Sequence, residues 1–172
     1  MFPNVVTTDL FINGDVRPAE NGRVYDLYTP ARPTELVGHA ASASQADMES
    51  AVQAAHAAFP AWSALSHGER ADKLRAVAAA LTADEDDVAA RSQLFTREHG
   101  KILRETQLEL SRLGDRFLLS AGYGERLAKD EEIAGPPFDT LISRQARGVA
   151  ALVVPWNWPL SILGAKLPQA LI

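Results

Sequence analysis

The hydrophobic pattern is strongest near the end of the chain. Residues 148–154 are small or apolar without a break, and the last two are β-branched. A run of this length that ends at a proline predicts a strand buried on both faces. Pro155 cannot donate a hydrogen bond to a sheet, so the strand is expected to end there. Pro159 suits the first position of a helix, which is expected over residues 160–167.

Upstream, apolar residues recur at helical spacing between residues 44 and 123, which predicts four helices. Pro60 is expected to end the first helix, and Gly100 to close the third. The fourth is expected from about Ile102 to Tyr123. Capping-box patterns open the first three, at Ser44–Asp47, Ser66–Glu69 and Thr82–Glu85. The expected apolar faces are Met48, Val52, Ala55 and Phe59 in the first helix, Leu74, Val77, Ala78 and Leu81 in the second, and Leu103, Thr106, Leu110, Leu113, Phe117 and Ala121 in the fourth.

Short strands are expected on either side of these helices. Asn13-Gly14 stands between short apolar segments and predicts a hairpin, because both residues tolerate positive φ. Residues 9–40 are expected to form two or three short antiparallel strands. The charged segment 129–137, rich in glycine and proline, is expected to be a loop, and the polar segment 139–147 one or two exposed strands. Strands and helices together predict an α/β fold.

The amino-acid composition excludes several classes of function. Hydrophobic residues make up 47% and charged residues 23%, which is typical of a globular protein. A formal net charge of −5 without a basic patch argues against nucleic acid or an anionic membrane as a partner. The chain has no cysteine, so it supplies neither a disulfide nor a thiol nucleophile. Met1–Leu10 lacks the features of a signal peptide, and a cytoplasmic location is expected.

Candidate chemistry is confined to one segment. The four histidines show no metal-binding spacing, so no metal site is expected. The acidic run 84–87 is better explained by the dipole of a helix that begins there. Neither a Gly-x-Gly-x-x-Gly sequence nor a phosphate loop is present. That leaves residues 155–159, either a turn with two anchoring tryptophans or a turn that aims an amide into a cleft, and the residues alone favour neither interpretation.

The segment Pro155-Trp156-Asn157-Trp158-Pro159 resembles a motif of the NAD(P)-dependent aldehyde dehydrogenase superfamily, Pro-Trp-Asn-Phe-Pro after an apolar strand. Other segments follow in the family's order. Leu10–Gly14 is similar to its opening hairpin, Tyr28–Pro33 to its Asn-Pro-Ala-Thr segment, Ala51–Trp62 to its first helix, and Glu98–Lys101 with Glu105 and Glu109 to its Glu-x-Gly-Lys junction. The resemblance implies the N-terminal part of the aldehyde dehydrogenase fold, with the first strand of a Rossmann-like cofactor domain at 148–154.

The resemblance also implies roles for individual residues. In the family a cysteine thiolate attacks the aldehyde, and the motif asparagine stabilises the oxyanion of the resulting thiohemiacetal, which makes Asn157 a catalytic residue. Lys166 matches a family lysine sometimes assigned to proton relay; alternatively, it only neutralises charge inside the fold. NAD or NADP is the implied cofactor. The residues implied to lie along it are Val153, Val154, Pro155 and Trp156.

Three regions follow from the resemblance. Residues 1–138 are expected to form strands and helices that flank the cofactor-binding domain, 139–147 part of an oligomerisation arm, and 148–172 the start of the NAD(P)-binding core. A small-molecule aldehyde is the expected substrate, and a homodimer or homotetramer the expected assembly.

The nucleophilic cysteine and the base glutamate of the family are expected outside the printed residues, so these residues alone are expected to be inactive. A non-catalytic binding or oligomerisation module derived from the same fold is the alternative. The identity of the aldehyde, the choice between NAD and NADP, and the acid-forming or acyl-CoA-forming branch stay open.

Overall fold

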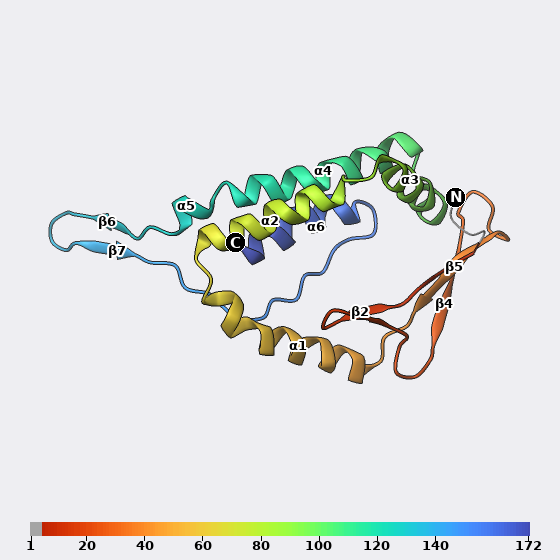
Figure 1. The fold of residues 1–172 in the computed structure, drawn as a ribbon, viewed down its shortest axis with the longest axis horizontal. Coiled ribbons are helices and arrows are strands. Elements are labelled where there is room, and N and C mark those ends of the chain that lie inside the picture. The colour runs from red at the N-terminus through yellow and green to blue at the C-terminus, as the bar shows by residue number, and fades with distance from the viewer. Residues whose placement is uncertain (1–4) are drawn as a thin grey trace. The chain divides into compact units, whose positions relative to one another are not determined.

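The computed structural model describes residues 5–172 and has the predicted α/β character (Figure 1). The first four residues, which belong to the segment Met1–Leu10 and to the expected region 1–138, lie outside the described residues. The strands are β1 (Val6–Thr8), β2 (Leu10–Ile12), β3 (Asp15–Arg17), β4 (Val24–Tyr28), β5 (Leu36–Ala41), β6 (Glu131–Ile133) and β7 (Thr140–Ile142). The helices are α1 (Gln45–Ser63), α2 (His67–Leu81), α3 (Glu85–His99), α4 (Leu103–Ala121), α5 (Gly124–Leu127) and α6 (Pro159–Leu171).

The chain divides into two compact units. The first comprises the residues up to Ala58 together with Asp84–Leu110, and the second comprises Phe59–Ala83 together with Ser111–Ile172. Helices α1 and α4 therefore each begin in the first unit and end in the second.

The first unit contains a hairpin and a three-stranded sheet. The β2–β3 hairpin turns at Asn13 and Gly14, with φ of 57° and 88°, which confirms the Asn-Gly prediction. The sheet has the order β1-β5-β4, in which β4 pairs antiparallel and β1 parallel to β5. Four strands, rather than two or three, thus begin within residues 9–40. The number is higher because segments of only three residues pair as strands in β2 and β3. At Gly38 a Cβ atom would lie 2.3 Å from the Val6 carbonyl oxygen, so only glycine fits between β1 and β5.

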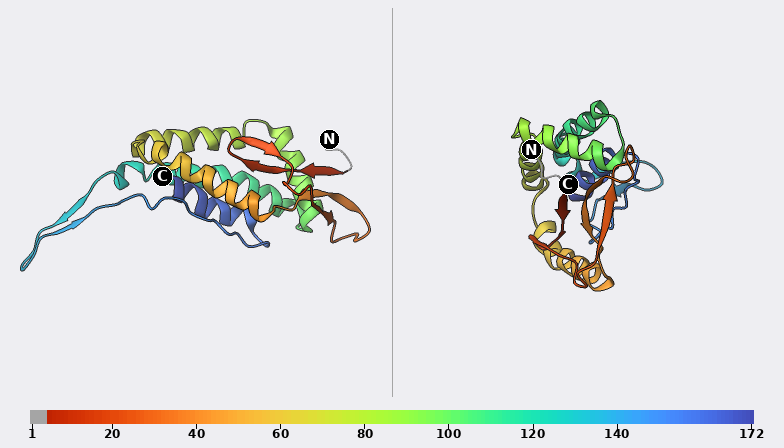
Figure 2. Two further views of the ribbon diagram at one scale, coloured as in Figure 1. Left: turned by 90° about the horizontal axis from the view of Figure 1, so that it is seen from below. Right: turned by 90° about the vertical axis from the view of Figure 1, so that its right-hand side faces the viewer.

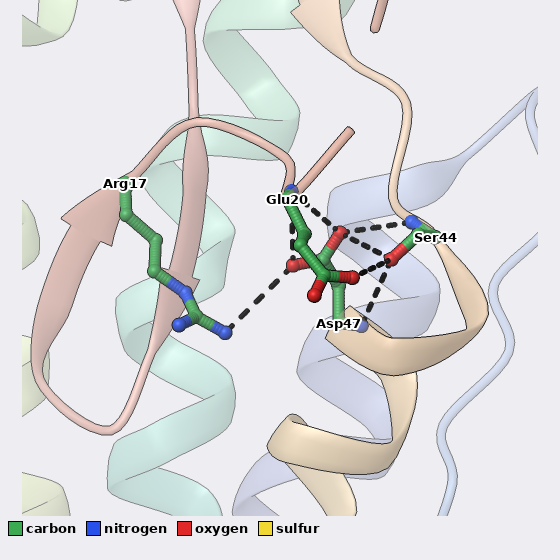
Figure 3. Close-up of polar contacts among 4 residues, drawn as sticks. All are labelled: Arg17, Glu20, Ser44 and Asp47. Carbon is green, nitrogen blue, oxygen red and sulfur yellow. Dashed lines mark hydrogen bonds and ion pairs between the residues drawn. The ribbon is translucent and has the colours of Figure 1, made fainter. Parts of the chain in front are cut away.

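Asp47 joins the start of α1 to the loop after β3 (Figure 3). The Ser44 N–H donates to its carboxylate at 2.9 Å, and the Asp47 N–H donates to the Ser44 hydroxyl at 3.1 Å, so the predicted capping box is confirmed. The Glu20 N–H donates to the same carboxylate at 3.1 Å, and the Arg17 guanidinium lies 3.8 Å from it. Asp47 is 2% exposed. These donors, the Ser44 N–H first, hold the pKa of Asp47 below its ordinary value although burial opposes them.

Helix α3 begins later than expected and ends as expected. Asp84, not Thr82, is the N-cap, since its carboxylate accepts from the N–H groups of Asp86 and Asp87. Gly100 ends the helix in the left-handed conformation at φ 83°. The side chain of Thr106 in α4 is buried and donates to the Ser92 carbonyl of α3 at 3.1 Å. Thr106 can therefore lie on the apolar face of α4, because its hydroxyl has a hydrogen-bond partner.

Helix α1 contradicts two expectations. It continues through Pro60 to Ser63 because a proline removes only one donor, and the Pro60 carbonyl still accepts from the Ala64 N–H at 3.1 Å. The Trp62 indole, in this last turn, donates to the Leu171 carbonyl at 2.9 Å. Of the predicted apolar face, Met48, Val52 and Ala55 are exposed and Phe59 is half-buried.

The core of the second unit lies between α2, α6 and the end of α4, which run side by side (Figures 1 and 2). The capping box of Ser66 and Glu69 opens α2 as predicted. The predicted faces of α2 and α4 are confirmed except at Val77 and Leu103, which are exposed. The buried cluster consists of Ala71, Leu74, Ala78, Leu113, Phe117 and Ala121, with Leu81, Leu160, Leu167, Leu171 and Ile172 packed against it.

Helix α6 begins at Pro159 as predicted, extends beyond 167 to Leu171, and approaches α4 at Gly164. A Cβ atom there would lie 3.0 Å from Cγ of Arg116 and 3.1 Å from Cδ1 of Leu113. The absence of a side chain at this position lets the two helices pack closely.

A two-stranded hairpin and an unpaired segment complete the second unit. β6 and β7 form an antiparallel hairpin that projects away from the helices of this unit (Figures 1 and 2). Segment 129–137 is therefore not only a loop, since its residues 131–133 pair with β7; the exposed strand expected in 139–147 is present. Residues 143–155 pair with no described strand, so the buried strand predicted at 148–154 is not formed within residues 5–172. An apolar run becomes a buried strand only beside neighbouring strands, and the described residues offer none there.

Among residues 5–172, no helix is both long and apolar enough to cross a membrane.

Replacing the buried Leu74 should destabilise the second unit far more than replacing its exposed neighbour Val77. Leu74 is 1% exposed and Val77 is 41% exposed on the same helix. Leu74→Ala should lower the free energy of unfolding by about 2–5 kcal/mol. Val77→Ala should change it by only about 0.5 kcal/mol. Urea unfolding followed by tryptophan fluorescence tests this, and equal effects would contradict the assignment of the core.

Protonation of Asp47 should weaken the first unit in acid. Because the folded pKa is depressed, the contribution of the charge is complete above the ordinary aspartate pKa of about 3.9 and is lost as pH falls through the folded pKa. Asp47→Asn should be less stable than the wild type at neutral pH. As pH falls below about 5, the variant should lose less of its unfolding free energy than the wild type does.

Denaturant unfolding by circular dichroism across this pH range measures the difference. The control is Asp72→Asn, which removes an exposed carboxylate in an ion pair with Arg75. Parallel stability curves for the wild type and Asp47→Asn would exclude the pH effect.

Candidate functional site

The candidate site is the turn at residues 153–158, between the unpaired segment and α6. Trp156, Asn157 and Trp158 bend the chain, and Pro159 begins α6. The Ile162 N–H donates to the Trp158 carbonyl at 3.0 Å, which forms the first turn of the helix. Pro159 suits this position because its missing N–H would have no partner within the helix. The turn is thus continuous with a helix that packs on the core of the second unit.

Apolar side chains on this turn are exposed. Val153 is 78% exposed and Trp156 is 69% exposed. Pro155 and Asn157 are also exposed, whereas Val154 is half-buried. Large exposed apolar side chains can be covered by another part of the protein or by another molecule.

Lys166 contacts the turn directly. Its Nζ donates a hydrogen bond to the Val153 carbonyl oxygen at 2.6 Å, across 13 positions of sequence. The structure therefore brings together two of the residues that the sequence singles out, Lys166 and Val153. Asn157 lies on the same turn, between that contact and α6.

A second polar cluster, which the sequence analysis did not identify, lies on β4 and β5 of the first unit. Nδ1 of His39 is 2.7 Å from Oδ1 of Asp26, and the Tyr28 hydroxyl donates to Oδ2 of Asp26 at 3.2 Å. The hydrogen bond and the negative charge of Asp26 raise the pKa of Tyr28. Asp26 and His39 face each other in the strand register. Only the register reveals this pairing, so the spacing of the residues along the chain could not.

Comparison with known proteins identifies the chain's relatives. The family model described as "Aldehyde dehydrogenase family" matches residues 16–172. The chain belongs to the aldehyde dehydrogenase family. All the candidate residues between Val153 and Lys166 lie within the matched region.

Individual family members show the same relationship. Glutarate-semialdehyde dehydrogenase of Pseudomonas putida is 33% identical over 162 residues, which are 94% of this chain and 33% of the relative. Succinate-semialdehyde dehydrogenase [NADP(+)] of Escherichia coli is 33% identical over 170 residues, which are 98% of this chain and 34% of the relative. The chain thus spans about a third of the length of these relatives.

Solved structures confirm the fold. An NADP-dependent enzyme of E. coli matches with a TM-score of 0.84 and 30% identity, over 96% of this chain and 34% of the other. A protein named PnpE, solved with nicotinamide adenine dinucleotide, matches with a TM-score of 0.82 and 31% identity, over 95% of this chain and 33% of the other. The N-terminal part of the aldehyde dehydrogenase fold is therefore confirmed as the fold of this chain.

The turn at 153–158 fits a dinucleotide of the kind these relatives use. Among its exposed side chains, Val153, Trp156 and Trp158 are apolar and uncharged, as suits contact with flat ring systems. Within residues 5–172, residues 153–155 pair with no strand, and the Val153 carbonyl accepts from Lys166.

Proposed function

We propose that this chain forms the N-terminal part of an NAD(P)-dependent aldehyde dehydrogenase that oxidises an aldehyde to a carboxylic acid. The observation that carries the proposal is the family match over residues 16–172, which includes the complete turn with Asn157. The relatives at 33% identity act, by their names, on glutarate and succinate semialdehyde, so an aldehyde that also bears a carboxylate is the first substrate class to test. A cytoplasmic location is part of the same proposal.

Asn157 is the proposed oxyanion-stabilising residue. When a thiolate adds to an aldehyde carbonyl, negative charge develops on the carbonyl oxygen, and a neutral amide N–H held in place can donate to it. The Asn157 side chain is exposed just before the start of α6, where it can meet a ligand. The thiolate must come from outside these residues, because they contain no cysteine.

Residues 153–156 are proposed to lie along the cofactor. A bound nicotinamide supplies the hydride acceptor of the reaction. Val153 and Trp156 offer exposed apolar surface for this contact, while Val154 and Pro155 shape the backbone between them. For Lys166, the proposed proton relay requires its ammonium to leave the Val153 carbonyl, with which it is hydrogen-bonded in this structure.

The three regions expected from the sequence, residues 1–138, 139–147 and 148–172, remain part of the proposal, and β7 lies in the second of them. Exposed apolar side chains on and beside the β6–β7 hairpin support its role in a homodimer or homotetramer. They are Ile133, Phe138, Leu141 and Ile142, of which Phe138 is 81% exposed.

The test supplies a semialdehyde with NAD⁺ or NADP⁺ to the natural protein that contains this chain, and follows the absorbance of the reduced nicotinamide. Reduction that depends on the aldehyde supports the proposal. Dinucleotide binding without reduction would favour the non-catalytic module. Absence of both dinucleotide binding and reduction would overturn both proposed functions.

Removal of the Asn157 amide should slow the reaction. Asn157→Ala should lower kcat by about 10²–10³-fold, the usual effect of losing one oxyanion donor. Dinucleotide affinity and the midpoint of thermal unfolding serve as controls, since neither depends on a transition-state contact. An unchanged kcat in the variant would show that Asn157 serves only to shape the turn.

Removal of apolar side chains from the hairpin should weaken self-association. Phe138→Ser with Leu141→Ser removes two exposed apolar groups without changing the core cluster. Sedimentation velocity should show a shift toward smaller species. The same substitutions at Met48 and Val52, exposed on α1 in the first unit, provide the control. Loss of the oligomer in the control alone would contradict the assignment.

A further inference from the structure

We propose that Lys166 is a positioning residue, whose ammonium group holds the Val153 carbonyl and thereby fixes the turn that carries Asn157. The contact between Nζ of Lys166 and the Val153 oxygen is 2.6 Å long. The importance of this turn rests on the proposed function, whereas the contact itself is a property of the fold.

The turn has two anchors. At its end, the Trp158 carbonyl accepts from the Ile162 N–H at 3.0 Å, inside the first turn of α6. At its start, the Val153 carbonyl accepts from Lys166. Four residues, 154–157, lie between these two points, and the ring of Pro155 restricts one of them. Among residues 5–172 no strand pairs with residues 143–155, and the bond from Lys166 ties the start of the turn to α6.

Lysine suits this position for two reasons. Its base is held by the core, because the next residue, Leu167, packs against the buried cluster of the second unit. Its flexible stem carries a charged donor across the surface to a neutral carbonyl, and a charged donor forms a stronger hydrogen bond than a neutral one. Lys166 thus ties the start of the turn to a helix that is packed on the core of the second unit.

The contact also limits what a ligand meets at the turn. While Lys166 occupies the Val153 carbonyl, a dinucleotide approaching the turn meets the exposed side chains of Val153 and Trp156. A relay function and a positioning function of Lys166 exclude each other at any one moment, because both use the same ammonium group. This makes the two roles separable by experiment.

The test compares three variants of the natural protein that contains this chain. Lys166→Met keeps the length of the side chain and removes the donor, and Lys166→Arg keeps a charged donor. Gln169→Met is the matched control, since Gln169 is exposed on the same helix three positions further on. Hydrogen–deuterium exchange of the peptide covering residues 148–158 is measured by mass spectrometry, without any ligand.

Lys166→Met should speed exchange of this peptide by roughly three- to tenfold, as expected for the loss of one solvent-exposed hydrogen bond. Lys166→Arg should restore most of the protection, and Gln169→Met should match the wild type. Equal exchange in the wild type and Lys166→Met would overturn the proposal. So would equal acceleration in Lys166→Met and Gln169→Met, which would indicate general loosening of α6.

Kinetics then separate positioning from proton relay. If Lys166 positions Asn157, Lys166→Met lowers kcat by a similar factor at every pH, and Lys166→Arg recovers activity. A loss that follows pH, without recovery by arginine, would favour the relay and overturn the positioning role. Absence of dinucleotide reduction in the wild type would refute the proposed function alone, because the exchange experiment still decides whether Lys166 holds the turn.

Discussion

The packing of α6 against α2 and α4 is the contact on which the candidate site depends. Leu160 and Leu167 of α6 lie against the buried cluster around Leu74 and Phe117. Within residues 5–172 no strand pairs with the segment before the turn, and α6, which follows the turn, connects Asn157 to this core. Burial of apolar side chains, a non-directional force, therefore determines where a directional amide donor stands.

Features that depend on neighbouring residues in the sequence could be predicted well. The capping boxes at Ser44 and Ser66, the αL glycine at Gly100 and the Asn13-Gly14 hairpin each need only a few adjacent residues. Features that depend on distant partners could not. The apolar run 148–154 has strand composition, but pairing requires a neighbouring strand, and α1 continues past Pro60 because its last turn has other partners.

The same distinction holds for the candidate site. The residue types in the motif and the resemblance to a family were enough to select Asn157, Lys166 and the segment 153–156. The hydrogen bond from Lys166 to the Val153 carbonyl was not predictable, because it joins a side chain to a backbone atom across a turn of irregular shape. The Asp26–His39 pair likewise requires the register of β4 against β5. Composition identifies the chemical groups, and tertiary structure decides which of them meet.

Gly164 gives this arrangement a further property. Successive residues of an α-helix are about 100° apart around its axis, so Gly164 and Lys166 point to nearly opposite sides of α6. Gly164 sits 3.0–3.1 Å, measured from an added Cβ, from atoms of α4, and Lys166 reaches outward to the turn. A larger residue at 164 would push α6 outward or rotate it, and the displacement would be passed to Val153. A buried glycine in the core of the second unit therefore limits which substitutions the turn tolerates, and a larger residue there would disturb the turn without touching it.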